Sequence, residues 1–409
     1  MNRSARSLFN TSRWAYLVYA GLAALVAAIK GFFYAHLLDE IQYASVNYYL
    51  LIVGAGSLLV SAGVIVRCHT EIPLLTRKPE EELINFINQV KNTGFLTWIV
   101  LCTILLLAQN IITLSAQIQI LSTIQVLVLF LFTIDLMCIK GRLDFIGYAK
   151  RLFNRNALIA LSGFAAAYLT ADASRTVFAE VICAVVFYWR GIAAFVSNIE
   201  IPKKIFLHQS LSFIPVTIVG AFLQFADRLL ASSVLPPEDF SKYSYFSLIV
   251  LAGLSIQQLV NTRVITVLPE ICEKNSKHGF IYTAKISATM AIFLLLVLST
   301  GMYLLQSPWF AASWVVQDYY TGSFFVFIAL ARSIDFYSSY LLAMGKKHIL
   351  FCIQLASSVL FLLVFIYHSF ISIISFSTFL ILACTIYATL LLSLTIASWS
   401  IRNVKATIS

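Results

Sequence analysis

Long apolar stretches alternate with short polar connectors along the whole chain, and this pattern predicts membrane-spanning helices. An α-helix crosses the hydrocarbon core of a bilayer in about 20 residues. We expect spans at residues 14–37, 45–66, 93–113, 118–139, 156–171, 176–196, 211–231, 243–268, 284–305, 320–344, 349–368 and 374–399. The predicted fold is therefore an all-α polytopic membrane protein with about twelve transmembrane helices.

The composition agrees with this pattern and leaves no room for a soluble domain. Of the 409 residues, 60% are hydrophobic and 11% are charged, whereas soluble domains have roughly half and about a quarter. The spans and their connectors use most of the chain. The seven cysteines show no metal-ligand spacing, and no phosphate-binding P-loop occurs. We expect no metal and no cofactor.

Lysine and arginine gather in every second connector, which sets the expected orientation. With these spans, 23 of the 28 Lys and Arg lie in segments assigned to the cytoplasm, and only Arg175 and Lys242 lie in outside connectors. Cytoplasmic loops of membrane proteins retain positive charge. We therefore expect both termini in the cytoplasm. The net charge of +10 reflects topology and attraction to anionic membrane lipid, and we expect no nucleic-acid partner.

A weak internal repeat divides the chain into two halves. The first span is followed by LLDEIQYASVNYYLLIVGAG, and the seventh by LPPEDFSKYSYFSLIVLAG. In each segment an acidic pair precedes a tyrosine, Tyr43 or Tyr243, that opens the next apolar run. Two related six-helix halves are a common transporter plan, with the solute site near the bilayer midplane. We expect one six-helix lobe at residues 1–205 and another at 206–409, around a central cleft.

The same segments resemble the polysaccharide flippases of the multidrug/oligosaccharidyl-lipid/polysaccharide exporter (MOP) superfamily. The likeness runs through LLDEIQYASVNYYL, FADRLLASSVLPPEDFSKYSYFSLI and LVNTRVITVLPEICE, and it continues in ALARSIDFYSSYLLAMGKKHIL. It covers most of the chain through hydropathy and loose motifs. The first turn lacks the Gly and the Pro that the family favours there.

This resemblance implies a function as well as a fold. It implies that the protein moves undecaprenyl-diphosphate-linked oligosaccharide, most often an O-antigen repeat unit for lipopolysaccharide, across the bacterial inner membrane. The family works by alternating access of two six-helix lobes, with coupling to an ion gradient. The resemblance further implies a monomer and suggests an O-antigen polymerase and a chain-length regulator as partners.

Charged residues inside the expected spans are the candidate site, because burying a charge in hydrocarbon costs a few kcal/mol or more. Lys30 precedes its acidic pair by nine residues and Arg228 precedes its own by ten. If the repeat holds, these two cations are near-symmetry mates that bind the diphosphate of the substrate. The alternative is that each side chain reaches the outer interface. Tyr34, on the first span, could stack on a sugar ring.

The other candidates are an arginine and four carboxylates. Arg332 and Asp335 are three residues apart on one helix face, so they either neutralise each other or act in substrate contact and gating, respectively. Asp227 points about 100° away from Arg228. Glu180 and Asp135 are lone carboxylates near span ends, where we expect interfacial solvation or a coupling role through protonation. Asp335, Asp227, Glu180 and Asp135 form the expected coupling group.

Two other functions remain open from the sequence. A membrane-embedded O-antigen polymerase or sugar acyltransferase needs catalytic groups in a sizeable outer loop, and the outside connectors here are short. A drug/cation antiporter of the same superfamily favours a carboxylate in the first span, where this chain has Lys30. We therefore expect a transporter and not an enzyme.

Overall fold

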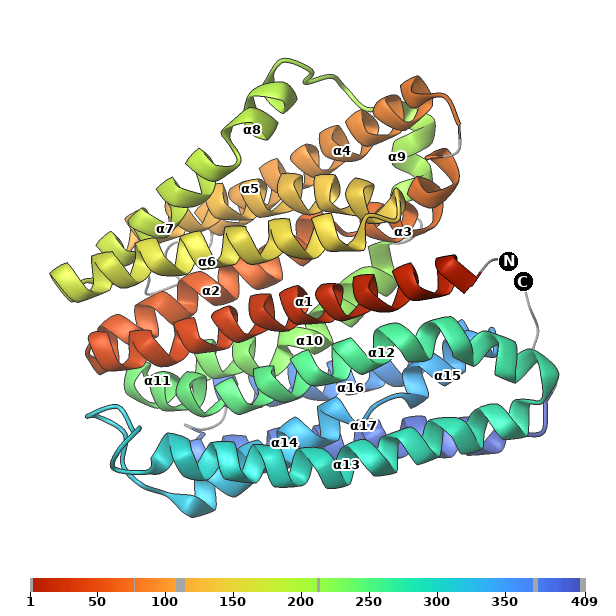
Figure 1. Ribbon diagram of the computed structural model, residues 1–409. Helices are drawn as coiled ribbons and strands as arrows, with labels where there is room; N and C mark the ends of the chain where they lie inside the picture. Colours follow the sequence, from red (N-terminus) through yellow and green to blue (C-terminus); the bar gives the residue numbers. More distant parts are fainter. Residues whose placement is uncertain (1–2, 77, 108–114, 212–213, 371–373, 405–409) are drawn as a thin grey trace. The chain divides into compact units, whose positions relative to one another are not determined.

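The computed structural model describes residues 3–76, 78–107, 115–211, 214–370 and 374–404, and within these ranges its regular structure is helical, with no strands (Figure 1). The chain forms two compact units, Met1–Ala221 and Phe222–Ser409, and the division falls inside α10 (Ile214–Val234). The sequence-based division after residue 205 into two six-helix lobes stays a prediction.

The first unit is built around α5. Its helices are α1 (Arg3–Leu37), α2 (Glu40–Val60), α3 (Val64–Leu75), α4 (Glu80–Leu107), α5 (Ala116–Gly141), α6 (Phe145–Thr170), α7 (Ala173–Phe187), α8 (Trp189–Val196) and α9 (Lys204–Leu211). Side chains of Asp39, Ser115 and Asp172 accept backbone N–H bonds that cap α2, α5 and α7. Because α5 contacts α2, α3, α4, α6, α7 and α8, it forms the centre of this unit.

The second unit continues from α10 through α11 (Pro237–Phe246), α12 (Leu248–Lys274), α13 (Ser276–Gln306), α14 (Tyr319–Ser333), α15 (Tyr337–Ala343), α16 (Lys347–Phe370) and α17 (Phe376–Ser400). The helices of the second unit, taken in order along the chain, pack against each other in the same pattern as those of the first unit. In the first unit α5 packs against α2, α4 and α7, and α6 packs against α7; in the second, α14 packs against α12, α13 and α17, and α16 packs against α17. This recurrence supports the internal repeat in the sequence.

Seven helical segments of the described chain are long and apolar enough to cross a membrane, namely α2, α4, α5, α13, α14 together with α15, α16 and α17. The pair α7 and α8, which is bent by 69°, qualifies as one further span. The expected all-α polytopic membrane fold is confirmed, whereas the count of twelve spans stays a prediction.

Several expected spans are broken into two helices. The span expected at 45–66 ends early because Gly63, with φ of 81°, separates α2 from α3. A Cβ at this position would lie 2.3 Å from the backbone oxygen of Ser210, so glycine permits both the left-handed turn and the close approach of α9. Similar breaks occur at Tyr188, between α7 and α8, and at Ser247, between α11 and α12.

Candidate functional site

Lys30 and Glu180 form a buried ion pair that joins α1 to α7. Lys30 Nζ lies 2.7 Å from the Glu180 carboxylate, whose side chain is 1% exposed. The Tyr34 hydroxyl, one helical turn after Lys30, donates a hydrogen bond to the same carboxylate. Lys30 therefore reaches Glu180 instead of the interface. The expectation that Glu180 is a lone, solvated carboxylate is wrong.

Gly163 on α6 leaves the space in which this pair forms. A Cβ at position 163 would lie 1.8 Å from the Tyr34 hydroxyl oxygen and 3.0 Å from Glu180 Cγ. Because α6 packs against both α1 and α7, a glycine here lets the two helices that carry the pair approach each other. Tyr34 is fully buried in this arrangement, which leaves no ring face for a sugar.

A second cation, Arg155 on α6, lies in the same interior. Arg155 is buried, with its guanidinium carbon 5.2 Å from the centroid of the Phe132 ring. It is close enough to Glu180 and Tyr49 to interact with both electrostatically. We define the first cluster as Lys30, Tyr34, Tyr49, Arg155 and Glu180. It holds two cations for one carboxylate.

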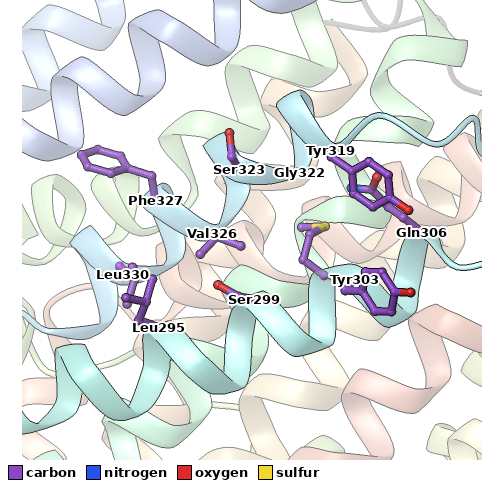
Figure 2. A pocket seen from close by; sticks show the side chains of 11 residues that line it. Leu295, Ser299, Tyr303, Gln306, Tyr319, Gly322, Ser323, Val326, Phe327 and Leu330 are labelled. Carbon is purple, nitrogen blue, oxygen red and sulfur yellow. The ribbon is translucent and has the colours of Figure 1, made fainter.

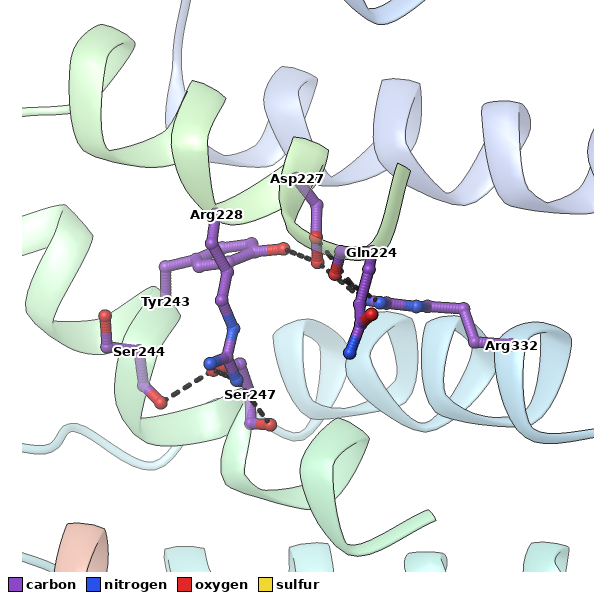
Figure 3. A network of polar contacts seen from close by, with 7 residues as sticks. All are labelled: Gln224, Asp227, Arg228, Tyr243, Ser244, Ser247 and Arg332. Carbon is purple, nitrogen blue, oxygen red and sulfur yellow. Dashed lines mark hydrogen bonds and ion pairs between the residues drawn. The ribbon is translucent and has the colours of Figure 1, made fainter. Parts of the chain in front are cut away.

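Asp227 on α10 is the centre of the second cluster (Figure 3). Its buried carboxylate accepts a 2.7 Å hydrogen bond from the Tyr243 hydroxyl on α11. Arg332 Nη1, from α14, lies 3.3 Å from Oδ1 and 3.2 Å from Oδ2 of the same carboxylate. Arg332 Nη2 also donates to the backbone oxygen of Gln224 at 2.7 Å. Arg332 thus pairs with Asp227, so the alternative in which Arg332 and Asp335 neutralise each other is wrong.

Arg228 turns away from Asp227 toward the break between α11 and α12 (Figure 3). Its Nη2 donates to Ser247 Oγ at 2.8 Å and lies 3.4 Å from the Ser247 backbone oxygen. The expectation that Asp227 and Arg228 point in different directions is confirmed. We define the second cluster as Gln224, Asp227, Arg228, Tyr243 and Arg332. In this cluster Asp227 pairs with Arg332, and Arg228 contacts Ser247.

Asp335 lies in the break between α14 and α15, where it acts as a helix cap. Its Oδ1 accepts from the Ser338 N–H at 3.1 Å and its Oδ2 accepts from the Ser338 hydroxyl at 2.6 Å. The backbone oxygen of Asp335 accepts from Gln257 Nε2 at 2.9 Å. These bonds satisfy polar groups that the break exposes inside an apolar segment.

We expect Asp335→Ala to destabilise the protein by about 1 kcal/mol, because it removes this cap. Asp335→Asn keeps an acceptor oxygen and should cost far less. Thermal unfolding of both variants in detergent measures the difference. Transport assays add a second reading: a pure cap tolerates asparagine, whereas a coupling carboxylate does not, so loss of transport in a stable Asp335→Asn protein would assign it a coupling role.

Asp135 on α5 stabilises the bend between α7 and α8. Lys91 Nζ, from α4, lies 2.6 Å from Asp135 Oδ1, and the Tyr188 hydroxyl donates to Oδ2 of the same carboxylate. Tyr188 is the residue that separates the two helices bent by 69°. Asp135 is therefore not the lone carboxylate that the sequence suggested.

The two halves of the internal repeat can be aligned by their helix caps instead of by their acidic pairs. This alignment gives a different register. Lys30 lies nine residues before Asp39, the N-cap of α2, and Asp227 lies nine residues before Pro236, the N-cap of α11. In this register the counterpart of Lys30 is Asp227, not Arg228. Each unit thus places one ion-paired residue at the same position, with opposite sign.

Sequence reasoning missed three interior cations that it counted as loop charges. Lys91 and Arg155 are described above, and Arg67 on α3 is buried between Glu71 and α9. Arg67 Nε lies 2.7 Å from Glu71 Oε1, and Nη1 donates to the backbone oxygen of Phe206 at 3.2 Å. The available signal was position: each of the three lies within one or two residues of an expected span.

Comparison with solved structures shows which fold this is. The chain is similar to the inward-facing conformation of a multidrug resistance MATE family transporter of the MOP superfamily, with a TM-score of 0.59 and 11% sequence identity. The likeness covers 96% of this chain and 99% of that chain. No protein-family profile and no curated protein matches the sequence. This likeness shows the fold, and membership of the MOP superfamily and of its polysaccharide flippases stays a prediction.

Proposed function

We propose that this protein is a flippase that translocates undecaprenyl-diphosphate-linked oligosaccharide, an O-antigen or related repeat unit, across the bacterial inner membrane by alternating access. The fold that it shares with a MATE family transporter supports transport over catalysis. In this proposal the protein works as a monomer without a cofactor. It delivers its cargo to an O-antigen polymerase and a chain-length regulator.

The observation that carries the proposal is the excess of positive charge in the first cluster, where Lys30 and Arg155 accompany a single carboxylate, Glu180. In the second cluster Arg332 pairs with Asp227, and Arg228 donates to Ser247. Asp335 directs its carboxylate to Ser338 instead. A site with surplus cations in a medium of low dielectric constant attracts a dense anion such as a diphosphate. A polysaccharide cargo linked to lipid through a diphosphate is consistent with positive charge at the site.

The ion pairs suggest how such a site is held when it is empty. Glu180 and Asp227 satisfy Lys30 and Arg332, which removes the cost of an unpaired buried cation. An arriving diphosphate competes with these carboxylates for the cations. In the proposal, Glu180, Asp227, Asp135 and Asp335 accept protons or rearrange as the cargo binds, which couples transport to a proton gradient.

Neutralising a pair together separates function from folding. The Lys30→Gln and Glu180→Gln double variant removes both charges of the ion pair and keeps side chains of similar size, so we expect it to reach the membrane, with Arg155 as the remaining charge of the first cluster. Export of surface polysaccharide should fall about tenfold or more, because a charge-assisted contact contributes about 1.5–3 kcal/mol. The assay measures surface polysaccharide in a deletion strain complemented with the variant, together with the leaflet in which the lipid-linked oligosaccharide accumulates.

The matched control is the exposed pair Lys274 and Glu270, 2.9 Å apart with side chains 73% and 70% exposed. Its double glutamine variant should export normally. Normal export by the Lys30 and Glu180 variant would remove these residues from the site. Normal surface polysaccharide in the deletion strain itself would overturn the proposed function.

A drug/cation antiporter is the main alternative, because the similar solved structure is a multidrug resistance transporter. A cationic drug requires surplus negative charge, whereas the first cluster has more cations than carboxylates. Drug resistance that depends on this chain, with unchanged polysaccharide, would favour the antiporter. An O-antigen polymerase or acyltransferase would instead leave lipid-linked repeat units in the outer leaflet.

A further inference from the structure

A groove of about 400 Å³ runs between α13 and α14 on the second unit (Figure 2). One face of α13 supplies Leu295, Ser299, Met302, Tyr303 and Gln306, and one face of α14 supplies Tyr319, Gly322, Ser323, Val326, Phe327 and Leu330. This volume lies within the range of about 300–1,000 Å³ typical of small-molecule sites. The clusters that carry the proposed function contribute no residue to this lining.

The groove is polar at one end and apolar at the other. Tyr303, Gln306 and Tyr319 gather at the end where α13 stops and α14 starts, whereas Leu295, Phe327 and Leu330 lie at the opposite end (Figure 2). The helix from Leu295 to Gln306 rises about 16 Å, at about 1.5 Å per residue. One leaflet of the hydrocarbon core is about 15 Å thick. The groove thus matches one leaflet in length and polarity.

Gln306 provides an unused donor at the polar end. Its Oε1 accepts from the Asp318 N–H at 3.0 Å, which fixes the orientation of the amide. Gln306 is fully buried, and its Nε2 has no hydrogen-bond partner among the residues that the structure describes. A Cβ at Gly322 would lie 2.2 Å from this nitrogen, so a glycine at this position leaves room for the Gln306 amide. An unpaired buried donor destabilises the fold, and an acceptor on a ligand would remove this penalty.

The connector holds this end in place. Asp318 caps α14 by accepting from the Thr321 hydroxyl and N–H. The hydroxyl bond is the main reason that the pKa of the Asp318 carboxyl lies below its ordinary value. The cap therefore stays ionised at neutral pH, and the Asp318 N–H that orients Gln306 stays in position.

Two exposed tyrosines complete the polar end. Tyr303 and Tyr319 are 60% and 56% exposed, with ring planes 15° apart and centroids 6.3 Å apart. Aromatic faces at a membrane interface offer an apolar surface beside polar hydroxyl groups. Among the described lining residues there is no charged side chain. This chemistry suits a neutral head rich in hydroxyl groups better than a phosphate.

We infer that the groove between α13 and α14 binds a glycosylated lipid from one leaflet. The sugar lies against Tyr303 and Tyr319 and accepts a hydrogen bond from Gln306 Nε2 when the side chains that bury this nitrogen move aside. The acyl or prenyl chain follows Leu295, Phe327 and Leu330 toward the membrane centre. This site is separate from the buried clusters, and it does not depend on the proposed export function.

Photo-crosslinking in lipid nanodiscs tests the inference. The probe is an alkyl glucoside with a diazirine in its chain, compared with the same chain on a phosphocholine head. We expect the glucoside to label the peptides that contain residues 295–306 and 319–330 about tenfold more strongly, which corresponds to about 1.4 kcal/mol. Tyr303→Ala, and Ser299→Phe, which fills the groove, should each reduce this labelling about tenfold.

Tyr367→Ala is the matched control, because Tyr367 is 50% exposed and lines the apolar groove between α16 and α17. It should leave labelling of α13 and α14 unchanged. Equal labelling by both heads, or labelling that survives Tyr303→Ala and Ser299→Phe in folded protein, would identify ordinary surrounding lipid and overturn the site. Neither readout involves polysaccharide export, so this test and that of the proposed function fail independently.

Discussion

Replacing Asp227 with alanine is expected to destabilise the second unit by about 3–5 kcal/mol, because the Arg332 guanidinium then stays buried without its counterion. Asp227 is fully buried and accepts hydrogen bonds from Tyr243 and Arg332. Both donors would lose their acceptor in one substitution. The measurement is the midpoint of thermal unfolding of the purified protein in detergent, followed by tryptophan fluorescence.

Two further variants identify the cause of this loss. Asp227→Asn combined with Arg332→Gln removes both charges and should recover most of the stability. Asp239→Ala is the exposed control in the same unit, where Lys242 lies 3.5 Å from a partly exposed carboxylate; surface pairs contribute about 0–1 kcal/mol. If Asp227→Ala is as mild as Asp239→Ala, the Asp227 pair has no special role in stability.

Gly163→Ala is expected to have the second large effect, a destabilisation of about 1–3 kcal/mol or more from overpacking. The added methyl group would lie 1.8 Å from the Tyr34 hydroxyl oxygen. Either α6 moves away from α1, or Tyr34 leaves Glu180. Both outcomes weaken the Lys30 and Glu180 pair, so export should fall along with the unfolding temperature.

Gly21→Ala is the control for this substitution, because a Cβ at Gly21 meets no atom within 4 Å. Replacing a helical glycine in open space should be neutral or should stabilise by about 0.4–1 kcal/mol. Combining Gly163→Ala with Tyr34→Phe removes the clashing hydroxyl and should restore part of the loss. A Gly163→Ala protein as stable as Gly21→Ala would show that α1 and α6 are farther apart than the structure places them.

The sequence predicts the helices well because the constraint that forms them is local. A chain inside hydrocarbon must satisfy its backbone hydrogen bonds within each segment, so an apolar run of sufficient length becomes a helix. The breaks at Gly63 and Asp335 are harder to predict. They depend on Ser210 and Gln257, which are distant in the sequence and approach only in the folded unit.

The partners of the buried charges could not be predicted in the same way. Lys30 and Glu180 are 150 residues apart, and Arg332 and Asp227 are 105 residues apart. The sequence showed that these charges lie in spans and need partners, but it offered only neighbours such as Asp335. Arg155 was missed for another reason: α6 begins at Phe145, well before the apolar run, so a residue that seemed to lie in a loop lies inside the helix.

The shared helix register of Lys30 and Asp227 makes the two halves of the chain non-interchangeable. Exchanging only these two residues would set an aspartate against Glu180 and a lysine against Arg332, so that attraction becomes repulsion in both places at once. Each half therefore carries its own counterion within its own fold. Any duplication from which the repeat arose must have been followed by paired changes in at least one copy. A chimaera built from two copies of either half would keep the ion pair inside each copy, but both copies would then carry the same charge at the shared position.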